Sequence, residues 1–468
     1  MKTDFKTVCQ DTGLTEDCGV FAAYDFDGGD VASVIYYGLF ALQHRGQESC
    51  GIAVSDTNGP QDSLKDEKDL GLLTEVFNAE KLEKLKGNLG LGHVSYPSEG
   101  GRKRENAQPL VLNYVKGTLG ISNNGSLTNA KELRDDLSYK GAIFQTTVDS
   151  ELIGYLIARE RINTPSVEAA VLAACRQLKG CYSFVVNSPR KMIGVRDPYG
   201  FRPLCIGKLD NTYIIASESC ALDTVGAEFI RDIEPGEIVT ISPEEGIVSD
   251  KTLQISKPAS CIFEYIYFAR PDSVVDGVGV YGARVRAGEI LARRFPVDAD
   301  LVVGVPDSGT PAGYGYALGS GIAHGNGFIK NNYVGRTFIK PKQSQRERAV
   351  SVKLNVLKEA VDGKRVIMVD DSIVRGTTSA KIVKSLREAG ATEVHVRISS
   401  PLFLHRCFYG TDIPSEDHLI AHNRTVEEIR EIIGADSLGF LEIEDLKEIV
   451  EGKVDFCDAC FSGNYPDK

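Results

Sequence analysis

The chain has 468 residues, of which 42% are hydrophobic, and a formal net charge of -12 at pH 7. This length exceeds one typical domain, so we expect two or three domains, each with its own core. The negative charge argues against nucleic acid as a partner, because phosphate backbones bind surfaces with a surplus of Lys and Arg.

Residues 1–17, MKTDFKTVCQDTGLTED, form a polar leader without the apolar core of a secretory signal. No later segment reaches the roughly 20 apolar residues of a membrane helix. We therefore expect a soluble cytoplasmic protein with no membrane partner. In a reducing compartment the eleven cysteines are expected to be core residues, nucleophiles or metal ligands rather than a disulfide framework.

Cys18 follows the leader directly, in TEDCGVFAAY. Taken alone, a Cys-Gly pair near the start of a chain favours a buried structural thiol. From Cys18 to about residue 248, β-rich runs such as YSFVV and TYIIAS alternate with helical stretches at residues 148–162 and 166–178. This pattern predicts a mixed sheet-and-helix domain, and EEGIVSDKTLQISKPAS at residues 244–260 indicates a polar connector after it.

From about Cys261 onward the sequence forms strand–loop–helix units. In KRVIMVDDSIVRGTTSAKIVKSLREAGATEVHVRI, the run VIMV predicts a buried strand, and Ile382, Val383 and Leu386 share one helical face. This segment is expected to be a βαβ unit. Residues 425–453 are expected to be helical and lead to the tail DFCDACFSG.

The first loop of this βαβ unit has the features of a phosphate site. Asp370 and Asp371 end the strand, and RGTTS follows at the start of a helix. Backbone N–H groups at a helix N-terminus favour an anion, and glycine lets the backbone approach it. The two carboxylates can hold sugar hydroxyls or a hydrated Mg²⁺. A lone Asp pair would be only a turn cap, but the whole run predicts a site for a phosphorylated sugar.

The run from Val366 to Ser379 resembles the phosphoribosyl pyrophosphate (PRPP) motif of type I phosphoribosyltransferases. The resemblance implies that Asp370 and Asp371 bind ribose hydroxyls and Mg²⁺. It also makes Ser308, in VPDSGTPAGYGYA, a candidate Mg²⁺ or pyrophosphate contact, although that run alone is only a turn. The implied PRPP-binding residues are Asp370, Asp371, Ser372, Arg375, Gly376, Thr377, Thr378 and Ser379.

Four segments resemble glutamine amidotransferases of the N-terminal nucleophile class: CGVFAAY, ALQHRGQESCGIAV, NNGSLTN and FQTTVDSE. The resemblance implies that the leader is removed before Cys18, which attacks the glutamine carboxamide with its freed α-amino group as general base. Asn124 and the N–H of Gly125 would stabilise the tetrahedral intermediate. The implied glutamine-binding residues are Arg45, Ser98 and Asp149.

Together with VRDPYGFRPLCIGK, FEYIYFARPDS and NYVGRTFI, these motifs resemble the amidophosphoribosyltransferase family from Cys18 to nearly the last residue. The resemblance implies a leader at residues 1–17 and an α+β N-terminal nucleophile hydrolase domain with four αββα layers at residues 18–250. An α/β phosphoribosyltransferase domain with a mostly parallel sheet would follow at residues 251–468, ending in a helical, cysteine-containing tail.

The implied reaction releases ammonia from glutamine at Cys18 and passes it internally to PRPP. There it displaces pyrophosphate from C1 and gives 5-phosphoribosylamine, the first step of purine biosynthesis. Closure of residues 333–341 over PRPP would exclude water. The resemblance further implies inhibition by purine nucleotides and a homo-oligomer, either a dimer or a tetramer.

Four cysteines suggest a metal centre. A CxxC pair such as Cys457 and Cys460 alone is compatible with zinc, redox chemistry or no function. The resemblance implies that Cys261, Cys407, Cys457 and Cys460 bind a [4Fe–4S] cluster, while a zinc site of four cysteines has the same ligand count and stays open.

The chain departs from the family pattern at several positions. GHVSYPS has Ser95 where the family has an arginine expected to pair with the glutamine α-carboxylate, a loss on the order of 2 kcal/mol of binding. Arg102 and Arg104, which are close in sequence, are the candidates to replace that charge. Asn123 occupies a position where the family usually has a histidine, and Asn332 and Ser351 occupy positions where arginine is common. These departures leave two alternatives: an ammonia-dependent paralogue with a weakened glutaminase, or a PRPP-binding regulatory protein.

Overall fold

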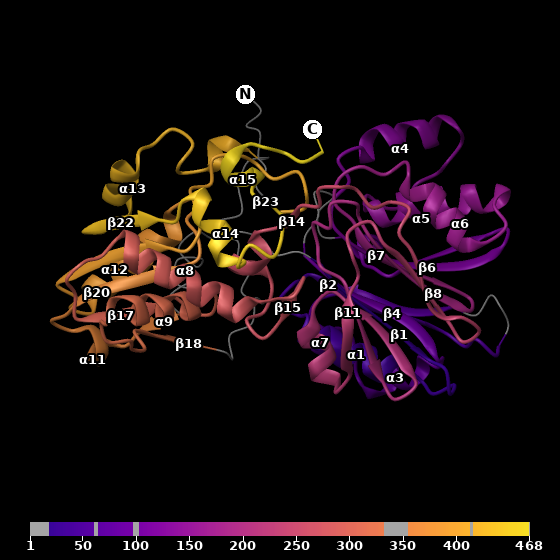
Figure 1. Cartoon of the computed structure of the whole chain (residues 1–468). Helices are drawn as coiled ribbons and strands as arrows, with labels where there is room; N and C mark the ends of the chain where they lie inside the picture. Colours follow the sequence, from indigo (N-terminus) through magenta and orange to yellow (C-terminus); the bar gives the residue numbers. More distant parts are fainter. Residues whose placement is uncertain (1–17, 60–63, 97–102, 332–353, 412–414, 468) are drawn as a thin grey trace, which may run out of the picture.

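A computed structural model describes residues 18–59, 64–96, 103–331, 354–411 and 415–467. The leader, Ser98, Arg102, Asn332, Ser351 and residues 333–341 lie outside these ranges, so the expectations placed on them stay predictions. The chain forms two halves that lie side by side, the first coloured indigo to magenta and the second orange to yellow (Figure 1).

The first half contains two antiparallel sheets. One has seven strands in the order β11-β9-β10-β1-β4-β2-β3. Its strands are β1 (Gly19–Asp25), β2 (Ser49–Ser55), β3 (Lys65–Leu70), β4 (Leu89–Ser95), β9 (Cys205–Leu209), β10 (Thr212–Ala216) and β11 (Glu228–Asp232). The other has six strands in the order β13-β12-β8-β7-β6-β5. Its strands are β5 (Leu110–Tyr114), β6 (Gly117–Asn124), β7 (Ser183–Ser188), β8 (Lys191–Arg196), β12 (Ile238–Ser242) and β13 (Gly246–Asp250).

Alternation of side chains along these strands produces three apolar layers. Val20 and Ala22 of β1 pack between the two sheets, whereas Phe21 and Ala23 pack outward against a first group of helices. A second group covers the outer face of the other sheet. The first group is α1 (Ala32–Ala41), α2 (Leu73–Val76), α3 (Ala79–Lys84) and α7 (Ser219–Val225); the second is α4 (Ala130–Tyr139), α5 (Asp149–Asn163) and α6 (Val167–Cys175). The four-layer αββα prediction is confirmed.

The expected polar connector at residues 244–260 was partly wrong. Gly246–Asp250 forms strand β13, which pairs antiparallel with β12 from Ser242 opposite Gly246 to Ile238 opposite Asp250. Gly246 has a φ of +67°, which makes the tight turn between the two strands possible. Because this strand lies at a sheet edge, its residues need not be apolar on both faces.

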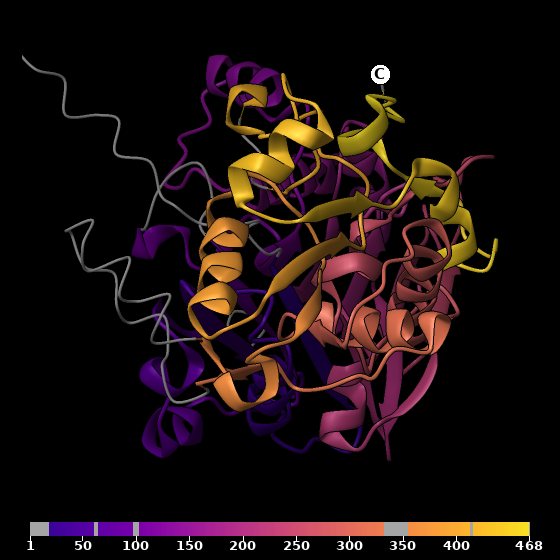
Figure 2. The ribbon, with the colours of Figure 1, turned by 90° about the vertical axis from the view of Figure 1, so that its left-hand side faces the viewer.

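The second half is built on a parallel sheet in the order β17-β20-β21-β22, seen in Figure 2 with helices on both faces. Val302 and Ile367 pack toward one pair of helices, and Val303 and Met368 pack toward the other. The strands are β17 (Leu301–Gly304), β20 (Arg365–Asp370), β21 (Glu393–Ile398) and β22 (Ser437–Phe440); the helices are α8 (Val280–Arg294) and α9 (Gly309–Ser320) on one face and α12 (Thr377–Glu388) and α13 (Val426–Ile433) on the other.

The predicted βαβ unit is β20, α12 and β21, with Ile382, Val383 and Leu386 buried as expected. The expected helix over residues 425–453 was wrong in its middle. Gly434, with a φ of +75°, ends α13, and Ser437–Phe440 then forms β22 beside β21. The pairing with β21 determines this strand, since a four-residue segment carries little signal of its own.

Short elements connect the two halves and complete the second. They are β14 (Ser260–Cys261), η2 (Glu264–Phe268), β15 (Val274–Val275), β16 (Val278–Gly279), β18 (Phe328–Lys330), β19 (Leu354–Val356), α11 (Lys358–Val361), η3 (Glu416–His418), η4 (Ile443–Asp445), α14 (Leu446–Ile449), β23 (Phe456–Cys457) and α15 (Ala459–Ser462), with η1 (Arg104–Asn106) in the first half. The parallel pair β14–β23 brings the end of the described chain against the start of the second half.

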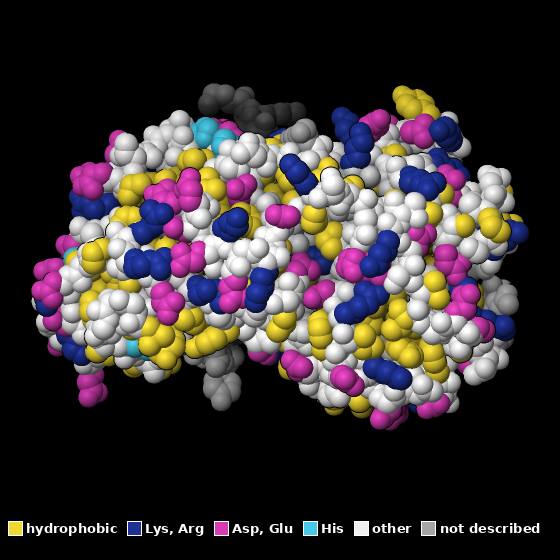
Figure 3. Space-filling model, viewed as in Figure 1, with side chains coloured by type: hydrophobic (Ala, Val, Ile, Leu, Met, Phe, Trp, Pro, Cys, Tyr) yellow, Lys and Arg dark blue, Asp and Glu magenta, His cyan; other side chains and the backbone are white. Residues whose placement is uncertain are grey.

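Charges of both signs lie interspersed over the face shown in Figure 3. Within the described residues, no helix is long and apolar enough to cross a membrane. No disulfide joins any two of the ten described cysteines.

Candidate active sites

The predicted nucleophile lies at one end of the space between the two large sheets. Cys18 immediately precedes β1, and its neighbour Gly19 pairs with Val94 of β4. Val20 packs into the layer between the sheets, and residues two apart along a strand share a face. Continued alternation therefore directs the Cys18 side chain toward the end of that layer.

The predicted oxyanion residues come to the same end from the other sheet. Asn124 is the last residue of β6, and the carbonyl of Asn123 beside it lies 3.0 Å from Nε2 of His93 in β4. His93 lies two positions before Ser95, the last residue of β4. This contact joins the ends of the two strands, so Cys18, Asn124 and Gly125 are gathered in one place.

The Asn124 side chain is fully buried, and neither its Oδ1 nor its Nδ2 has a hydrogen-bond partner within the described part of the chain. A buried amide without partners is rare and costly, and a catalytic or binding role is one explanation for it. Gly125 has a φ of +134°, and a Cβ there would lie 2.4 Å from the Cys181 carbonyl oxygen. Only glycine fits, which leaves its backbone N–H beside the Asn124 amide.

The predicted acid Asp149 is the first residue of α5 and half-buried. Its Oδ2 accepts a hydrogen bond of 2.8 Å from the backbone N–H of Leu127. The acid is thus fixed to the loop that follows Asn124 and Gly125.

The departure at Ser95 lies beside Cys18. In the register of β1 and β4, Gly19 lies opposite Val94, so Ser95 falls opposite Cys18. Ser95 also pairs with Ser49 in β2, and the two hydroxyls form a hydrogen bond. Arg104, suggested as a replacement charge, is exposed and lies 3.6 Å from Asp69.

Arg45, predicted to bind glutamine, lies in a fully buried ionic network. Its Nε donates to Glu218, and its Nη1 donates to Oε1 of Glu264 over 3.3 Å. Burial alone would raise the pKa of Glu218, but the charges of Arg45 and His44 hold that pKa well below its usual range. Glu264 belongs to the second half, so this network joins the halves; glutamine binding by Arg45 stays a prediction.

The predicted PRPP site lies at the carboxyl edge of the parallel sheet, where open α/β sheets bind their ligands. Asp370 ends β20, Asp371 follows it, and each is 8% exposed. Gly309, at the start of α9, packs against this strand so closely that a Cβ would lie 2.6 Å from the Val369 carbonyl oxygen. This contact brings Ser308 to the carboxylates.

Asp370 and Asp371 form a buried carboxylate pair whose surroundings include two serine hydroxyls. Ser308 Oγ donates to Asp371 Oδ2, and Ser372 Oγ donates to Oδ1 over 2.5 Å. Burial and the charge of Asp371 together raise the pKa of Asp370 well above its usual range. Burial also raises the pKa of Asp371, although the two serine hydroxyls act in the opposite direction. Two buried adjacent carboxylates of this kind suit a divalent cation with oxygen ligands.

The predicted phosphate loop turns into α12 directly after the aspartates. Gly376 precedes this helix with a φ of +77°, and Thr377 is its first residue. The helix has twelve residues, and Ser379 in its first turn is buried. Arg375, Thr377, Thr378 and Ser379 thus surround a helix N-terminus, the expected place for an anion.

Several buried residues near these sites were missed by reasoning from sequence. His93, in the quoted GHVSYPS segment, links the sheets; Gln108 Oε1 accepts from the Asn123 N–H over 2.9 Å. Arg284 is buried and donates to the Tyr265 carbonyl over 3.0 Å and to the Ala269 carbonyl over 2.7 Å. Burial lowers the pKa of Arg284 to about 10. Only tertiary structure reveals these partners, because they lie far apart in the sequence.

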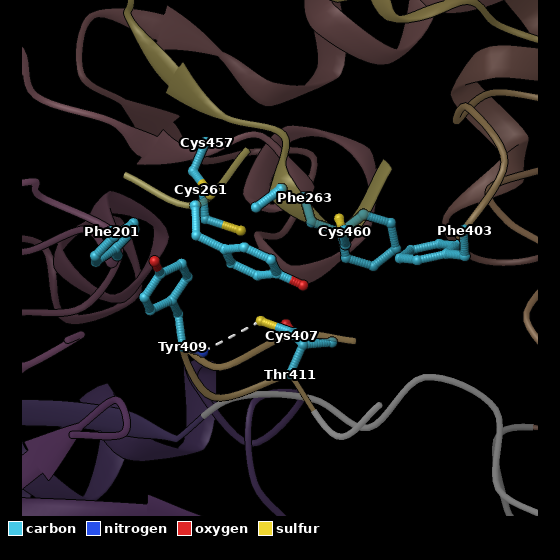
Figure 4. Close-up of a pocket in the computed structure, with 11 residues that line it drawn as sticks. Phe201, Cys261, Phe263, Phe403, Cys407, Tyr409, Thr411, Cys457 and Cys460 are labelled. Atoms are coloured by element: carbon cyan, nitrogen blue, oxygen red, sulfur yellow. Dashed lines mark hydrogen bonds between the residues drawn. The ribbon is translucent and has the colours of Figure 1, made fainter. Parts of the chain in front are cut away.

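The four predicted cluster ligands line one pocket, together with aromatic residues including Phe201 and Tyr409. Cys261 and Cys457 pair across β14 and β23, and the sulfurs of Cys261 and Cys407 point into the pocket in Figure 4. The backbone N–H of Tyr409 donates to Cys407 Sγ over 3.3 Å. Burial and the neighbouring thiols raise the pKa values of Cys457 and Cys460.

Among the described residues, no group of three or more Cys, His, Asp or Glu side chains is close enough to form a ready-made site for a single metal ion. The four thiols therefore lie around a shared pocket rather than around one point. Their chemistry fits a thiolate-bound group, and metal binding stays a prediction.

Comparison with known proteins covers nearly the whole chain. A glutamine amidotransferase domain model matches residues 101–224. The amidophosphoribosyltransferase from Methanocaldococcus jannaschii is 47% identical to this chain, and the match covers 96% of this chain and 97% of the relative. The amidophosphoribosyltransferase from Bacillus subtilis is also 47% identical, and the match covers 97% of this chain and 95% of the relative.

Two solved structures are similar over the same extent. Glutamine phosphoribosylpyrophosphate amidotransferase from B. subtilis, in complex with ADP and GMP, is 45% identical with a TM-score of 0.89 and covers 96% of this chain and 98% of its own. A structure described as the allosteric regulatory enzyme of purine biosynthesis is 46% identical with a TM-score of 0.90 and covers 96% of each chain.

Proposed function

The chain belongs to the amidophosphoribosyltransferase family, and from the geometry of its two sites we propose how it carries out the reaction of that family. It is a glycosyltransferase that uses glutamine to aminate PRPP in purine biosynthesis. One site hydrolyses glutamine to glutamate and ammonia. The other replaces the pyrophosphate on C1 of PRPP by ammonia and releases 5-phosphoribosylamine and pyrophosphate.

We assign glutamine hydrolysis to Cys18, Asn124 and Gly125. Cys18 Sγ attacks the carboxamide carbon, and the proton passes through the α-amino group that is freed when residues 1–17 are removed. The oxygen that gains negative charge is held by Asn124 Nδ2 and the Gly125 N–H. The buried Asn124 amide, which has no partner among the described residues, is the observation that supports this assignment most strongly.

The charges of the glutamine α-amino and α-carboxylate groups indicate which side chains would contact them. Asp149 would accept the substrate α-amino group while the Leu127 N–H keeps the carboxylate oriented. The α-carboxylate would meet the hydroxyls of Ser49 and Ser95, which are neutral donors, with Ser98 adding a third hydroxyl. This composition predicts weak binding of glutamine, as a neutral hydrogen bond is weaker than a charged bidentate pair.

We assign PRPP binding to Asp370, Asp371, Ser372 and the segment from Arg375 to Ser379. The helix N-terminus and hydroxyls would hold the 5-phosphate, and the aspartates would hold the ribose hydroxyls. Mg²⁺ would bind to the aspartates and Ser308 and supply positive charge for the departing pyrophosphate. The raised pKa values of the two buried aspartates support this, because a cation would relieve their repulsion.

A [4Fe–4S] cluster is the proposed occupant of the cysteine pocket. Cys261, Cys407, Cys457 and Cys460 would each hold one iron, and the cluster would tie the C-terminal segment to the start of the second half. Zinc is the alternative, and metal analysis with an absorption spectrum distinguishes the two. We further propose that the protein is a cytoplasmic homo-oligomer inhibited by purine nucleotides. The B. subtilis structure in complex with ADP and GMP supports the binding of purine nucleotides.

Pyrophosphate release from PRPP, measured with glutamine or with ammonium as nitrogen source, tests the function. Comparable turnover with both sources is expected. Turnover with ammonium alone would identify an ammonia-dependent paralogue, and PRPP binding without pyrophosphate release would identify a regulatory protein. The intact mass of the purified protein tests the processing step, since a chain beginning at Cys18 is expected.

A further inference from the structure

The Asp467 carboxylate bridges the cysteine pocket and the glutamine site. Its Oδ2 accepts a hydrogen bond of 3.0 Å from Thr128 Oγ1, and its Oδ1 accepts one from the hydroxyl of Tyr409. Thr128 follows Asn124 and Gly125 by only a few residues, whereas Tyr409 lines the cysteine pocket. One carboxylate therefore contacts both regions.

The loop from Gly125 to Thr128 is held at both ends against the segment before β7. The Cys181 N–H donates to the Ser126 carbonyl over 3.0 Å, and the Thr128 N–H donates to the Lys179 carbonyl over 2.9 Å. Gly125 itself lies against the Cys181 backbone. A shift of Thr128 would therefore be transmitted to the Gly125 N–H.

The same segment packs against the cysteine pocket. Cys181, Phe201, Tyr409 and Cys457 belong to one buried apolar cluster. The rings of Phe201 and Tyr409 stack with their centroids 4.1 Å apart and an angle of 18° between their planes. Tyr409 is thus fixed by its ring in the pocket and by its hydroxyl on Asp467.

We propose that Asp467 is a positioning residue for the oxyanion loop, and that it couples the order of the cysteine pocket to the rate of glutamine hydrolysis. The inference rests on the roles assigned above to Asn124 and Gly125. With the Asp467 bridge in place, Thr128 is held and the Gly125 N–H keeps the direction that the tetrahedral intermediate needs. Without it, the loop samples other arrangements while Cys18 keeps its own.

The expected effect is selective. Because the net contribution of one such hydrogen bond is modest, its loss should decrease a rate by about threefold to tenfold. The decrease should appear in kcat for glutamine hydrolysis, with KM for glutamine little changed, because the loop acts on the intermediate. Ammonium-dependent pyrophosphate release should not change, since that reaction takes place in the second half.

The test compares Asp467→Ala, Thr128→Val and the double variant in the full-length enzyme. Asp467→Asn serves as the conservative variant, because an amide oxygen can still accept from Thr128. Asp135→Ala is the matched control, since Asp135 lines the same surface groove as Thr128 and Asp467. The measurements are glutaminase kcat and KM, ammonium-dependent activity, and the alkylation rate of Cys18 followed by peptide mass spectrometry.

We expect both single variants to lower glutaminase kcat about threefold to tenfold and the double variant to lower it no further. Asp467→Asn should recover most of the rate, and Asp135→Ala should match the wild type. Cys18 alkylation should be unchanged in every variant. Unchanged glutaminase in Asp467→Ala, additive losses in the double variant, or equal losses of both activities would overturn the proposal. A wild-type enzyme without glutaminase activity would instead refute the assigned function.

Discussion

Arg45 of the first half and Glu264 of the second form an ion pair with fully buried side chains, Nη2 lying 2.5 Å from Oε2. Arg202 approaches the same carboxylate, with Nη1 3.4 Å from Oε1. The two halves of the enzyme are therefore joined by charges from which water is excluded. Such a link holds only one relative arrangement well, because each charge needs its partner at hydrogen-bond distance.

We predict that Glu264→Gln destabilises the protein by about 3–5 kcal/mol, since it leaves two buried arginines short of negative charge. Unfolding by denaturant measures this. Glu448→Gln is the control, because Glu448 pairs with Arg293 on the surface and such pairs contribute less than about 1 kcal/mol. The ratio of glutamate to pyrophosphate produced should also rise above one in Glu264→Gln, as ammonia escapes between misaligned halves. Equal stability of the two variants would refute the role of the network.

Ser95→Arg should improve glutamine binding. A guanidinium opposite Cys18 would pair with the substrate α-carboxylate, and about 2 kcal/mol corresponds to a KM about 30-fold lower. The measurement is KM for glutamine, with ammonium-dependent turnover as a reference that should stay constant. Ser95→Met provides similar length without charge and should not lower KM. If the Arg and Met variants have the same KM, the α-carboxylate does not bind beside Ser95.

Asp371→Asn should weaken the second site only. Removing one of the two carboxylates weakens the proposed Mg²⁺ site, so kcat/KM for PRPP with ammonium should fall about 100-fold at fixed Mg²⁺. The Mg²⁺ concentration for half-maximal rate should rise as well, while glutaminase activity is retained. Asp298→Asn, at an exposed ion pair with Arg365, is the control. An unchanged Mg²⁺ dependence would show that the cation binds elsewhere.

The stability of the folded protein should depend on pH through His93, which links the two sheets. Its ring is fully buried and its pKa is lowered to about 4, because burial disfavours the charged form. Between about pH 6.5 and 4 the unfolded chain binds a proton that the folded protein does not, so stability is lost as the pH falls. From pH 7.5 to 5.5 the loss from this residue is about 1 kcal/mol.

The His93→Gln variant, which keeps a donor for the Asn123 carbonyl, isolates this contribution. Denaturant unfolding at the two pH values should show a smaller loss in the variant than in the wild type. The difference between the two proteins removes the effect of other titrating groups, such as the buried Asp197. An identical pH dependence in both would mean that folding does not lower the pKa of His93.

Much of the architecture follows from the sequence. The long helix at residues 149–163 and the βαβ unit around Asp370 have strong periodicity and were predicted close to their observed bounds. Strands β13 and β22 were missed because short strands depend on a partner elsewhere in the chain. The motifs indicated the residues of both proposed sites, whereas the partners of Arg45 and the packing of Gly125 on Cys181 depend on tertiary contacts.

We infer that one chain holds a glutaminase centred on Cys18 and a separate PRPP site. The most direct test is pyrophosphate release by Cys18→Ala with glutamine and with ammonium as alternative nitrogen sources. We expect at least about a 1000-fold loss with glutamine, since the covalent step is removed, and ammonium-dependent activity within about twofold of the wild type. Retained glutamine-dependent activity, or equal loss with both nitrogen sources, would contradict it.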